Sequence, residues 1–145
     1  MNPSLSTILS SVAALPGVVR VILTSPDGLV FEQYTGFSSS SDSSTSLSAD
    51  VLAAEMATAT MALNRALGGL SSQKLHRYSF ASEHHEILAL NLGRVLLVTA
   101  VQTGASLRPV QVEMAKAASL IGTQFSTLIE PVCIRAQRKN SNQVL

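Results

Sequence analysis

The three histidines lie close together in the sequence and carry side chains suited to metal chemistry. His84 and His85 are adjacent and precede Glu86, and His76 lies a short distance upstream. A zinc ion needs several ligands that converge on one point. Adjacent side chains on an extended chain point to opposite sides, so His84 and His85 are poorly arranged to chelate one ion. We interpret this segment as a surface turn and predict no metal site.

Nucleophilic and phosphate-binding chemistry also lack a suitable set of residues. The single cysteine, Cys133, has neither an adjacent base nor a predicted helix N-terminus that would activate its thiol. The acidic residues Asp27, Asp42 and Asp50 fall at predicted turns or at a helix start, where structural roles suffice. The sequence contains no P-loop and no dinucleotide-binding motif. It therefore predicts a protein that is not an enzyme and that holds no cofactor.

The composition describes one small domain. The chain has 145 residues, a mass of 15.3 kDa and 46% hydrophobic residues, which is enough for one core. A formal charge of +1 and 4% aromatic residues argue against a nucleic-acid-binding surface. A single cysteine excludes an internal disulfide, and we expect a cytoplasmic protein. The most apolar run, residues 95–101, is far shorter than the roughly 20 residues that cross a bilayer, so we predict no membrane insertion.

The beginning of the chain predicts a helix followed by a β-hairpin. Apolar residues recur at helical spacing over residues 5–15, with Asn2 as the expected N-cap. Residues 18–24 are rich in β-branched side chains and predict a buried strand. The sequence Ser25-Pro26-Asp27-Gly28 predicts a tight turn, and the alternating pattern over residues 29–34 predicts a second strand.

Serine dominates the segment that follows this hairpin. Eight of the eleven residues at 38–48 are serines. Such a segment buries too little apolar surface to offset the entropy of ordering it, so we predict a flexible loop at residues 36–48. This loop either gates access to the next helix or has no role of its own. Residues 1–130 are expected to form one domain, followed by a polar, weakly basic tail at residues 131–145.

A long helix is predicted over residues 49–67, with Gly68-Gly69 as its end. Its expected core-facing stripe consists of Leu52, Met56, Ala59, Thr60, Leu63 and Leu67. Its flanks are small and weakly charged, with Ala53, Ala54, Ala57, Thr58 and Ala62, and Met61 lies nearly opposite the stripe. Either a second helix packs against this surface, or the alanines merely favour a helix with an ordinary exposed face. We favour the packed helix.

The remainder predicts three strands and a final helix. The strands are expected at residues 74–80, 87–92 and 95–101, and Gly93-Arg94 joins the last two as a tight hairpin. The final helix is expected over residues 109–129. Its core-facing residues are Val110, Met114, Ala117, Ile121, Phe125 and Leu128.

This order of elements, together with particular residues, resembles the roadblock family, which includes dynein light chains and bacterial partners of Ras-like polarity GTPases. The matching segments are Leu15-Pro16-Gly17-Val18, Ser25-Pro26-Asp27-Gly28-Leu29, the alanine-rich helix at 49–67 that closes on Gly68-Gly69, the apolar strand at 95–101 and the amphipathic last helix. The similarity covers about residues 3–128. The serine-rich connector looks longer than is usual in the family.

The resemblance implies an α/β (α+β) sandwich of the profilin-like type. Its order is α-β-β-α-β-β-β-α, with a five-stranded antiparallel sheet, the middle helix on one face and the terminal helices on the other. It further implies a homodimer in which two middle helices pack antiparallel and the strands at 74–80 join edge to edge. The interface residues expected on this basis are Ala53, Ala57, Met61, Asn64, Leu75, Arg77 and Tyr78.

The resemblance also implies a protein partner, a Ras-like small GTPase that binds the paired helices. The residues expected to face it are Ala54, Thr58 and Arg65. Bacterial members of this type can accelerate GTP hydrolysis by stabilising the active conformation of the GTPase, whereas other members only scaffold complexes. The sequence leaves both roles open. The alternative function is a small-molecule sensor of PAS, GAF or profilin-like architecture, which would need a pocket with convergent polar groups.

Overall fold

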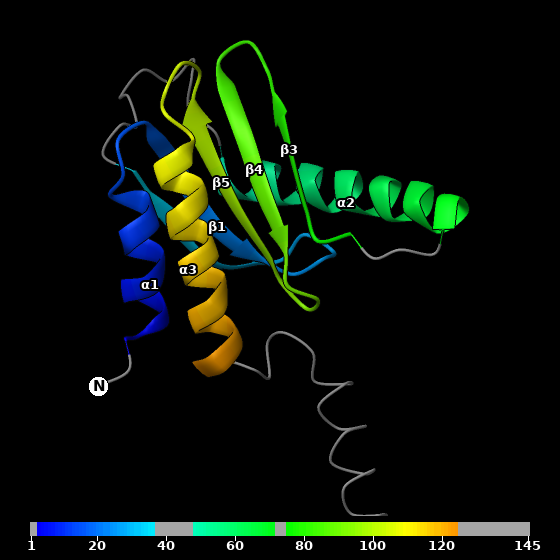
Figure 1. Cartoon of the computed structure of the whole chain (residues 1–145), viewed down its shortest axis with the longest axis horizontal. Helices are drawn as coiled ribbons and strands as arrows, with labels where there is room; N and C mark the ends of the chain where they lie inside the picture. Colours follow the sequence, from blue (N-terminus) through cyan, green and yellow to red (C-terminus); the bar gives the residue numbers. More distant parts are fainter. Residues whose placement is uncertain (1–2, 37–47, 72–74, 125–145) are drawn as a thin grey trace, which may run out of the picture.

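The computed structural model describes residues 3–36, 48–71 and 75–124, which form one sheet with helices on both faces (Figure 1). The elements are α1 (Leu5–Ala13), β1 (Val18–Thr24), β2 (Val30–Thr35), α2 (Ala49–Ser71), β3 (Arg77–Ala81), β4 (His85–Asn91), β5 (Leu96–Gln102) and α3 (Arg108–Gln124). The five strands are antiparallel in the order β2-β1-β5-β4-β3, so β2 and β3 are the edges. The predicted fold class and order of elements are confirmed.

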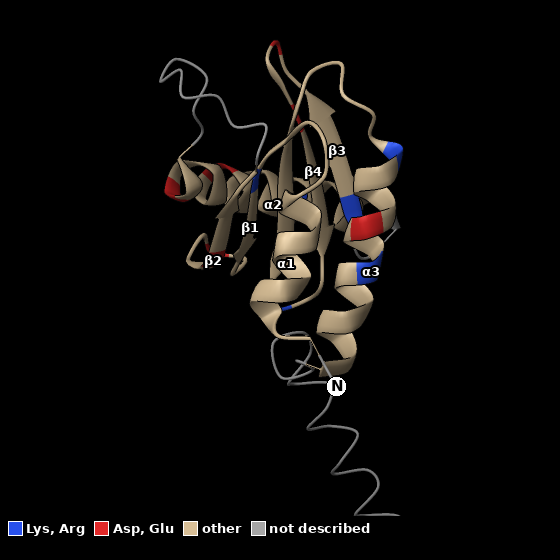
Figure 2. Ribbon diagram, turned by 90° about the vertical axis from the view of Figure 1, so that its left-hand side faces the viewer, with Lys and Arg blue, Asp and Glu red and all other residues tan. Residues whose placement is uncertain are grey.

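The two faces of the sheet carry separate cores. On one face, α1 and α3 lie side by side and cover the larger core, while α2 crosses the opposite face (Figure 1). The largest fully buried side chains of the first core are Leu9, Leu23, Leu97, Met114 and Ile121. The second core is formed by Ile22, Leu52, Met56, Leu96 and Val98, with small alanines between them. Figure 2 shows that charged residues are sparse on the helices that cover both cores.

Helix α1 begins later than the sequence predicted. Ser4 is its N-cap, because the Ser4 hydroxyl accepts a hydrogen bond of 3.2 Å from the Thr7 N–H. The prediction of Asn2 as the cap is therefore wrong, and Asn2 itself lies outside the described residues.

The predicted turn between β1 and β2 is confirmed. Gly28 has a φ of +94°, and its N–H donates to the Ser25 carbonyl at 3.0 Å. The Ser25 hydroxyl donates to Asp27 Oδ1 at 2.6 Å, and this bond lowers the pKa of the Asp27 carboxyl. The turn is thus closed by both its backbone and its side chains.

Helix α2 does not end where the sequence predicted. Gly68 and Gly69 lie inside the helix, which continues to Ser71, because a glycine costs only about 1 kcal/mol within a helix. The core-facing stripe is buried only in its first half. Leu63 is 37% exposed and Leu67 is half-buried, because α2 has by then passed the edge strand β3 (Figure 1).

The last part of the described chain follows the predicted pattern with shifted bounds. β3 is shorter than the predicted strand at 74–80, and residue 74 lies outside the described residues. In α3 the predicted core residues Val110, Met114, Ala117 and Ile121 are buried. Phe125, Leu128, Cys133, the serine-rich segment at 37–47 and the tail at 131–145 lie outside the described residues. Within the described part of the chain, no helix is long and apolar enough to cross a membrane.

Candidate functional site

Among the described residues no strand pairs with the outer edge of β3, and the hydrogen-bonding pattern of this edge can be derived from the inner edge. On the inner edge, the Asn91 N–H donates to the His76 carbonyl and the Ser82 N–H donates to the His85 carbonyl, both at 2.7 Å. In an antiparallel pair, residues alternate between those that bond to the neighbouring strand and those that do not. The even-numbered residues from 76 to 82 are therefore bonded to β4.

The odd-numbered residues of β3 direct their backbone groups away from the sheet. The N–H and C=O groups of Arg77, Ser79 and Ala81 point outward, whereas those of Tyr78 and Phe80 point to β4. The side chains alternate too, so Arg77 and Ser79 lie on the α3 side of the sheet and Tyr78 lies on the α2 side. An unpaired row of this kind is a template for another strand.

Tyr78 fixes the point at which α2 crosses this edge. Its hydroxyl lies 2.7 Å from Thr60 Oγ1 and donates to the Met56 carbonyl at 3.2 Å. Burial raises the pKa of the Tyr78 hydroxyl above its usual value. Tyr78, expected at a dimer interface, is thus half-buried within its own chain and ties β3 to α2.

The outer side of α2 carries one exposed stripe. Ala54, Thr58, Met61 and Arg65 are all exposed, and their spacing of four, three and four residues places them on one face of the helix. Met61 is 59% exposed. The residues expected to face a GTPase therefore share a surface with Met61, on the side of α2 that points away from the sheet.

Two alanines expected at the dimer interface lie elsewhere. Ala53 is fully buried and Ala57 is 7% exposed, because both face the protein's own sheet and hairpin. A β-carbon built on Gly28 would lie 3.6 Å from the Ala57 β-carbon and 3.4 Å from the Ala54 α-carbon. Ala53 and Ala57 therefore make room for the β1–β2 turn, and their side chains pack within their own chain.

The other interface residues divide between buried and exposed. Leu75 is 8% exposed and its carbonyl accepts a hydrogen bond of 2.9 Å from the Asn91 side chain, so it belongs to its own domain. Asn64 and Arg77 are exposed. Of the expected set, Met61, Asn64 and Arg77 present accessible side chains.

An apolar hollow of about 380 Å³ lies beside α2, next to the end of β3. Val51, Glu55 and Ala59 line it from the helix, and Phe80 and Ile87 line it from the sheet. Val51 and Phe80 are 60% and 43% exposed. Large exposed apolar side chains around one hollow indicate a surface that another protein covers.

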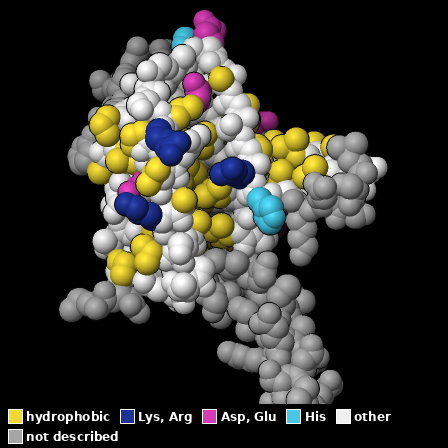
Figure 3. Space-filling model, in the orientation of Figure 1, with side chains coloured by type: hydrophobic (Ala, Val, Ile, Leu, Met, Phe, Trp, Pro, Cys, Tyr) yellow, Lys and Arg dark blue, Asp and Glu magenta, His cyan; other side chains and the backbone are white. Residues whose placement is uncertain are grey.

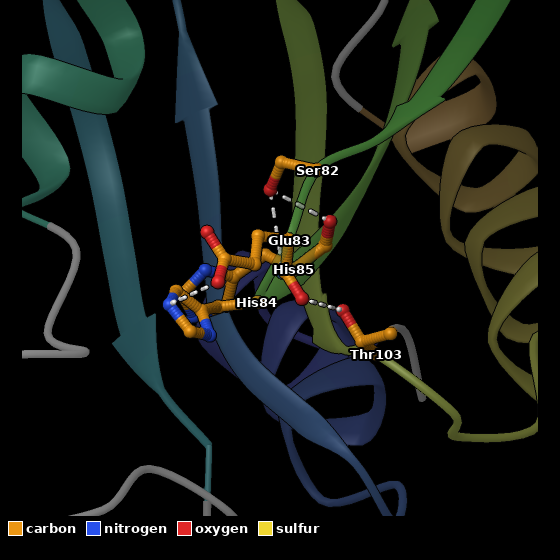
Figure 4. Close-up of polar contacts among 5 residues, drawn as sticks. All are labelled: Ser82, Glu83, His84, His85 and Thr103. Atoms are coloured by element: carbon orange, nitrogen blue, oxygen red, sulfur yellow. Dashed lines mark hydrogen bonds and ion pairs between the residues drawn. The ribbon is translucent and has the colours of Figure 1, made fainter.

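The histidine segment forms the β3–β4 turn (Figure 4). The Ser82 hydroxyl donates to the His85 carbonyl at 3.0 Å, and Thr103 Oγ1 donates to the Glu83 carbonyl at 3.3 Å. His84 is exposed and lies 4.0 Å from the Glu83 carboxylate. Among the described residues, no group of three or more His, Cys, Asp or Glu side chains is placed to hold a metal ion.

Comparisons with known proteins agree on one fold. A search of curated protein sequences finds no significant match. A solved structure described as MglB with tetrameric arrangement has a TM-score of 0.73 and 17% identity, and covers 88% of each chain. The gliding protein MglB from Thermus thermophilus also has a TM-score of 0.73, with 16% identity, covering 88% of this chain and 89% of that one. A Roadblock/LC7 domain from Streptomyces avermitilis has a TM-score of 0.67 and 19% identity, covering 86% of this chain and 100% of that one.

The sequence itself matches a family over the whole sheet and the first two helices. The Roadblock/LC7 domain family matches residues 5–103, from the start of α1 to the end of β5. This range covers more than half of the chain and contains every segment in which the sequence resembles the roadblock family except the last helix. The protein therefore belongs to the Roadblock/LC7 domain family.

Proposed function

We propose that this protein is a homodimeric, non-enzymatic regulator or scaffold that binds a Ras-like small GTPase. The observation that carries the proposal is the overhang of α2, whose sheet-facing stripe continues past β3 as Leu63 and Leu67 with no sheet of its own chain beneath it. In the proposed dimer, a second copy of the chain buries these apolar side chains. Family membership and the likeness to solved MglB structures support the partner class.

The outward backbone groups of β3 suggest how two copies pair. A two-fold axis through Ser79 sets Ser79 against its own counterpart, and Arg77 against Ala81 of the partner subunit. In this register all three outward residues of β3 form hydrogen bonds to the partner strand. With an axis through Tyr78 or Phe80, only two of the three would do so. The two sheets then form one continuous sheet across the dimer.

The same register brings the two α2 helices together. Because Tyr78 ties α2 to β3, a two-fold axis at Ser79 makes the two helices cross the sheet about two residues apart, or roughly 7 Å. Packed helices usually lie about 8–10 Å apart, so only small side chains fit between them. Ala59, Ala62 and Ala66 provide such a surface on the side of α2 that borders the 380 Å³ hollow. The partner's overhanging helix fills that hollow.

A proline at Ser79 tests this strand pairing. Ser79 donates no ladder hydrogen bond to β4, so Ser79→Pro removes an outward N–H while the β3–β4 ladder stays intact. We expect Ser79→Pro to be a folded monomer in light scattering and Ser79→Ala to remain a dimer. A dimeric Ser79→Pro variant with an unchanged dissociation constant would exclude this edge as the interface.

The GTPase partner is tested through the exposed stripe of α2. We expect immobilised protein to capture a Ras-like GTPase from the source cell when the lysate contains a non-hydrolysable GTP analogue, and Thr58→Glu to lose it. Asp50→Ala, which alters an exposed charge on the first turn of the same helix, serves as the control. Faster GTP hydrolysis by the recovered protein would indicate a regulator, and an unchanged rate a scaffold. Failure to recover any GTPase would overturn this part of the proposal.

A further inference from the structure

A second surface lies on the opposite face of the sheet from α2, between α3 and the β3–β4 hairpin. It is a hollow of about 440 Å³. Leu88 and Leu90 line it from β4, and Met114 and Ala115 line it from α3. Figure 3 shows yellow apolar side chains gathered on this face, with dark blue cationic and magenta acidic side chains among them. A volume of this size lies within the range of about 300–1,000 Å³ that is typical of binding pockets.

One charged side chain among the described residues lines this groove, and it is a cation. Arg77 lines it from β3, and no carboxylate is among the described residues that line it. Gln111 also lines the groove, and Arg108 lies one helical turn before it. Arg108 therefore lies beside the groove at the N-terminus of α3. Both arginines are exposed.

The start of α3 adds to this positive potential. A helix N-terminus carries a partial positive charge, and α3 has no acidic residue in its first turn to offset it. The nearest acid on α3, Glu113, is half-buried and lies 3.8 Å from Lys116. The groove therefore combines apolar lining residues with one arginine and the nearby N-terminus of α3, and no carboxylate is among the described residues that line it.

We propose that this groove docks a short acidic, amphipathic segment of another protein. Apolar side chains of the segment pack against Leu90 and Ala115, and its Asp or Glu side chains reach Arg77 and Arg108. A nucleic-acid backbone matches the charge but has no apolar side chain to place against Leu90 and Ala115, so the accessible apolar lining favours a peptide. Because the groove and α2 lie on opposite faces of the sheet, the protein can hold this segment and the proposed GTPase at the same time.

Selection from a random peptide library displayed on phage, with the full chain as bait, tests the groove directly. We expect enriched peptides to combine Asp or Glu with large apolar residues. A synthetic copy of the most enriched peptide should bind Ala115→Trp and Arg108→Glu roughly tenfold more weakly, because the first fills the groove and the second reverses its rim charge. Lys116→Glu, an exposed charge reversal on the same helix, is the matched control and should bind normally.

The possible outcomes distinguish a failure of the groove proposal from a failure of the dimer proposal. Light scattering on the same variants reports the dimer, so loss of peptide binding by an intact dimer supports the groove alone. Enriched peptides that lack acidic residues, or that bind Ala115→Trp as tightly as the natural sequence, would overturn the proposal. Enrichment of no peptide would overturn it as well.

Discussion

Two buried hydroxyl groups in this fold have opposite energetic roles. The Thr60 hydroxyl bonds to Tyr78, whereas the Thr99 hydroxyl is fully buried in β5 with no hydrogen-bond partner among the described residues. A satisfied buried bond contributes about 1 kcal/mol, and an unsatisfied hydroxyl costs about 1–3 kcal/mol. The sequence shows both as threonines, and only their neighbours decide which one stabilises the protein.

Thr99→Val should therefore stabilise the domain. Valine has nearly the same shape as threonine and removes the unpaired hydroxyl, so we expect the free energy of unfolding in urea to rise by about 1 kcal/mol. Thr60→Val is the matched comparison and should lower it by about 1 kcal/mol, because it leaves Tyr78 with one partner fewer. Equal effects of the two substitutions would contradict this assignment.

Tyr78 should make the stability of the domain depend on pH at the alkaline end. Burial raises the pKa of Tyr78 in the folded state above its usual value of 10.0. The folded state then holds the hydroxyl proton more tightly than the unfolded chain, so its contribution is complete below pH 10 and is lost as the pH rises through the folded pKa. We expect Tyr78→Phe to reduce the alkaline loss of stability measured by urea unfolding. Tyr34→Phe is the control, and an equal effect there would show that Tyr78 is not the group responsible.

At the scale of elements, the sequence predicted which segments are helices and strands because each has a regular apolar period and a distinct turn. The buried positions of α3 and the Gly28 turn are examples of local patterns that determine local structure. The end of α2 could not be predicted in this way. Gly68 and Gly69 are typical of a helix end, but they lie in an exposed part of the helix, where a β-carbon at either glycine would meet no described atom within 4 Å.

The candidate site was predicted only in part for a related reason. Small residues on α2 indicate close packing, but not against which neighbour, and the structure assigns Ala53 and Ala57 to the protein's own hairpin. The sequence could not show that the N–H and C=O groups of Ser79 point away from the sheet. That direction follows only from the hydrogen bonds between β3 and β4. Leu63 and Leu67 continue the predicted core-facing stripe along the helix, but Leu63 is exposed and Leu67 is only half-buried, because their burial depends on where the sheet ends.

Replacement of Gly68 by alanine tests whether α2 truly continues beyond the predicted end. A β-carbon at Gly68 would meet no atom within 4 Å, so Gly68→Ala should raise the helix content and stabilise the domain by about 1 kcal/mol. Circular dichroism and urea unfolding measure the two effects. Gly28→Ala is the contrasting case, because its φ of +94° disfavours any side chain, and it should be destabilising. A destabilising effect of Gly68→Ala would indicate a helix end at this glycine.

At the scale of the whole molecule, one domain offers three distinct surfaces. The β3 edge and the α2 overhang suit a second copy, the outer stripe of α2 suits a GTPase, and the cationic groove beside α3 suits an acidic segment. The groove shares Arg77 and Ser79 with the β3 edge, whereas the outer stripe of α2 shares no residue with either. Such an arrangement is what a regulator or scaffold of signalling complexes needs.

The measurement that tests the account most directly is the mass in solution at micromolar concentration, by light scattering, of the natural sequence and two variants. We predict twice the 15.3 kDa of one chain for the natural sequence and for Met61→Glu, whose side chain lies on the outer stripe. Leu63→Glu places a charge on the sheet-facing stripe of the overhang and should give a folded single chain. A natural sequence that is monomeric, or a Leu63→Glu variant that remains fully dimeric, would contradict the proposed assembly.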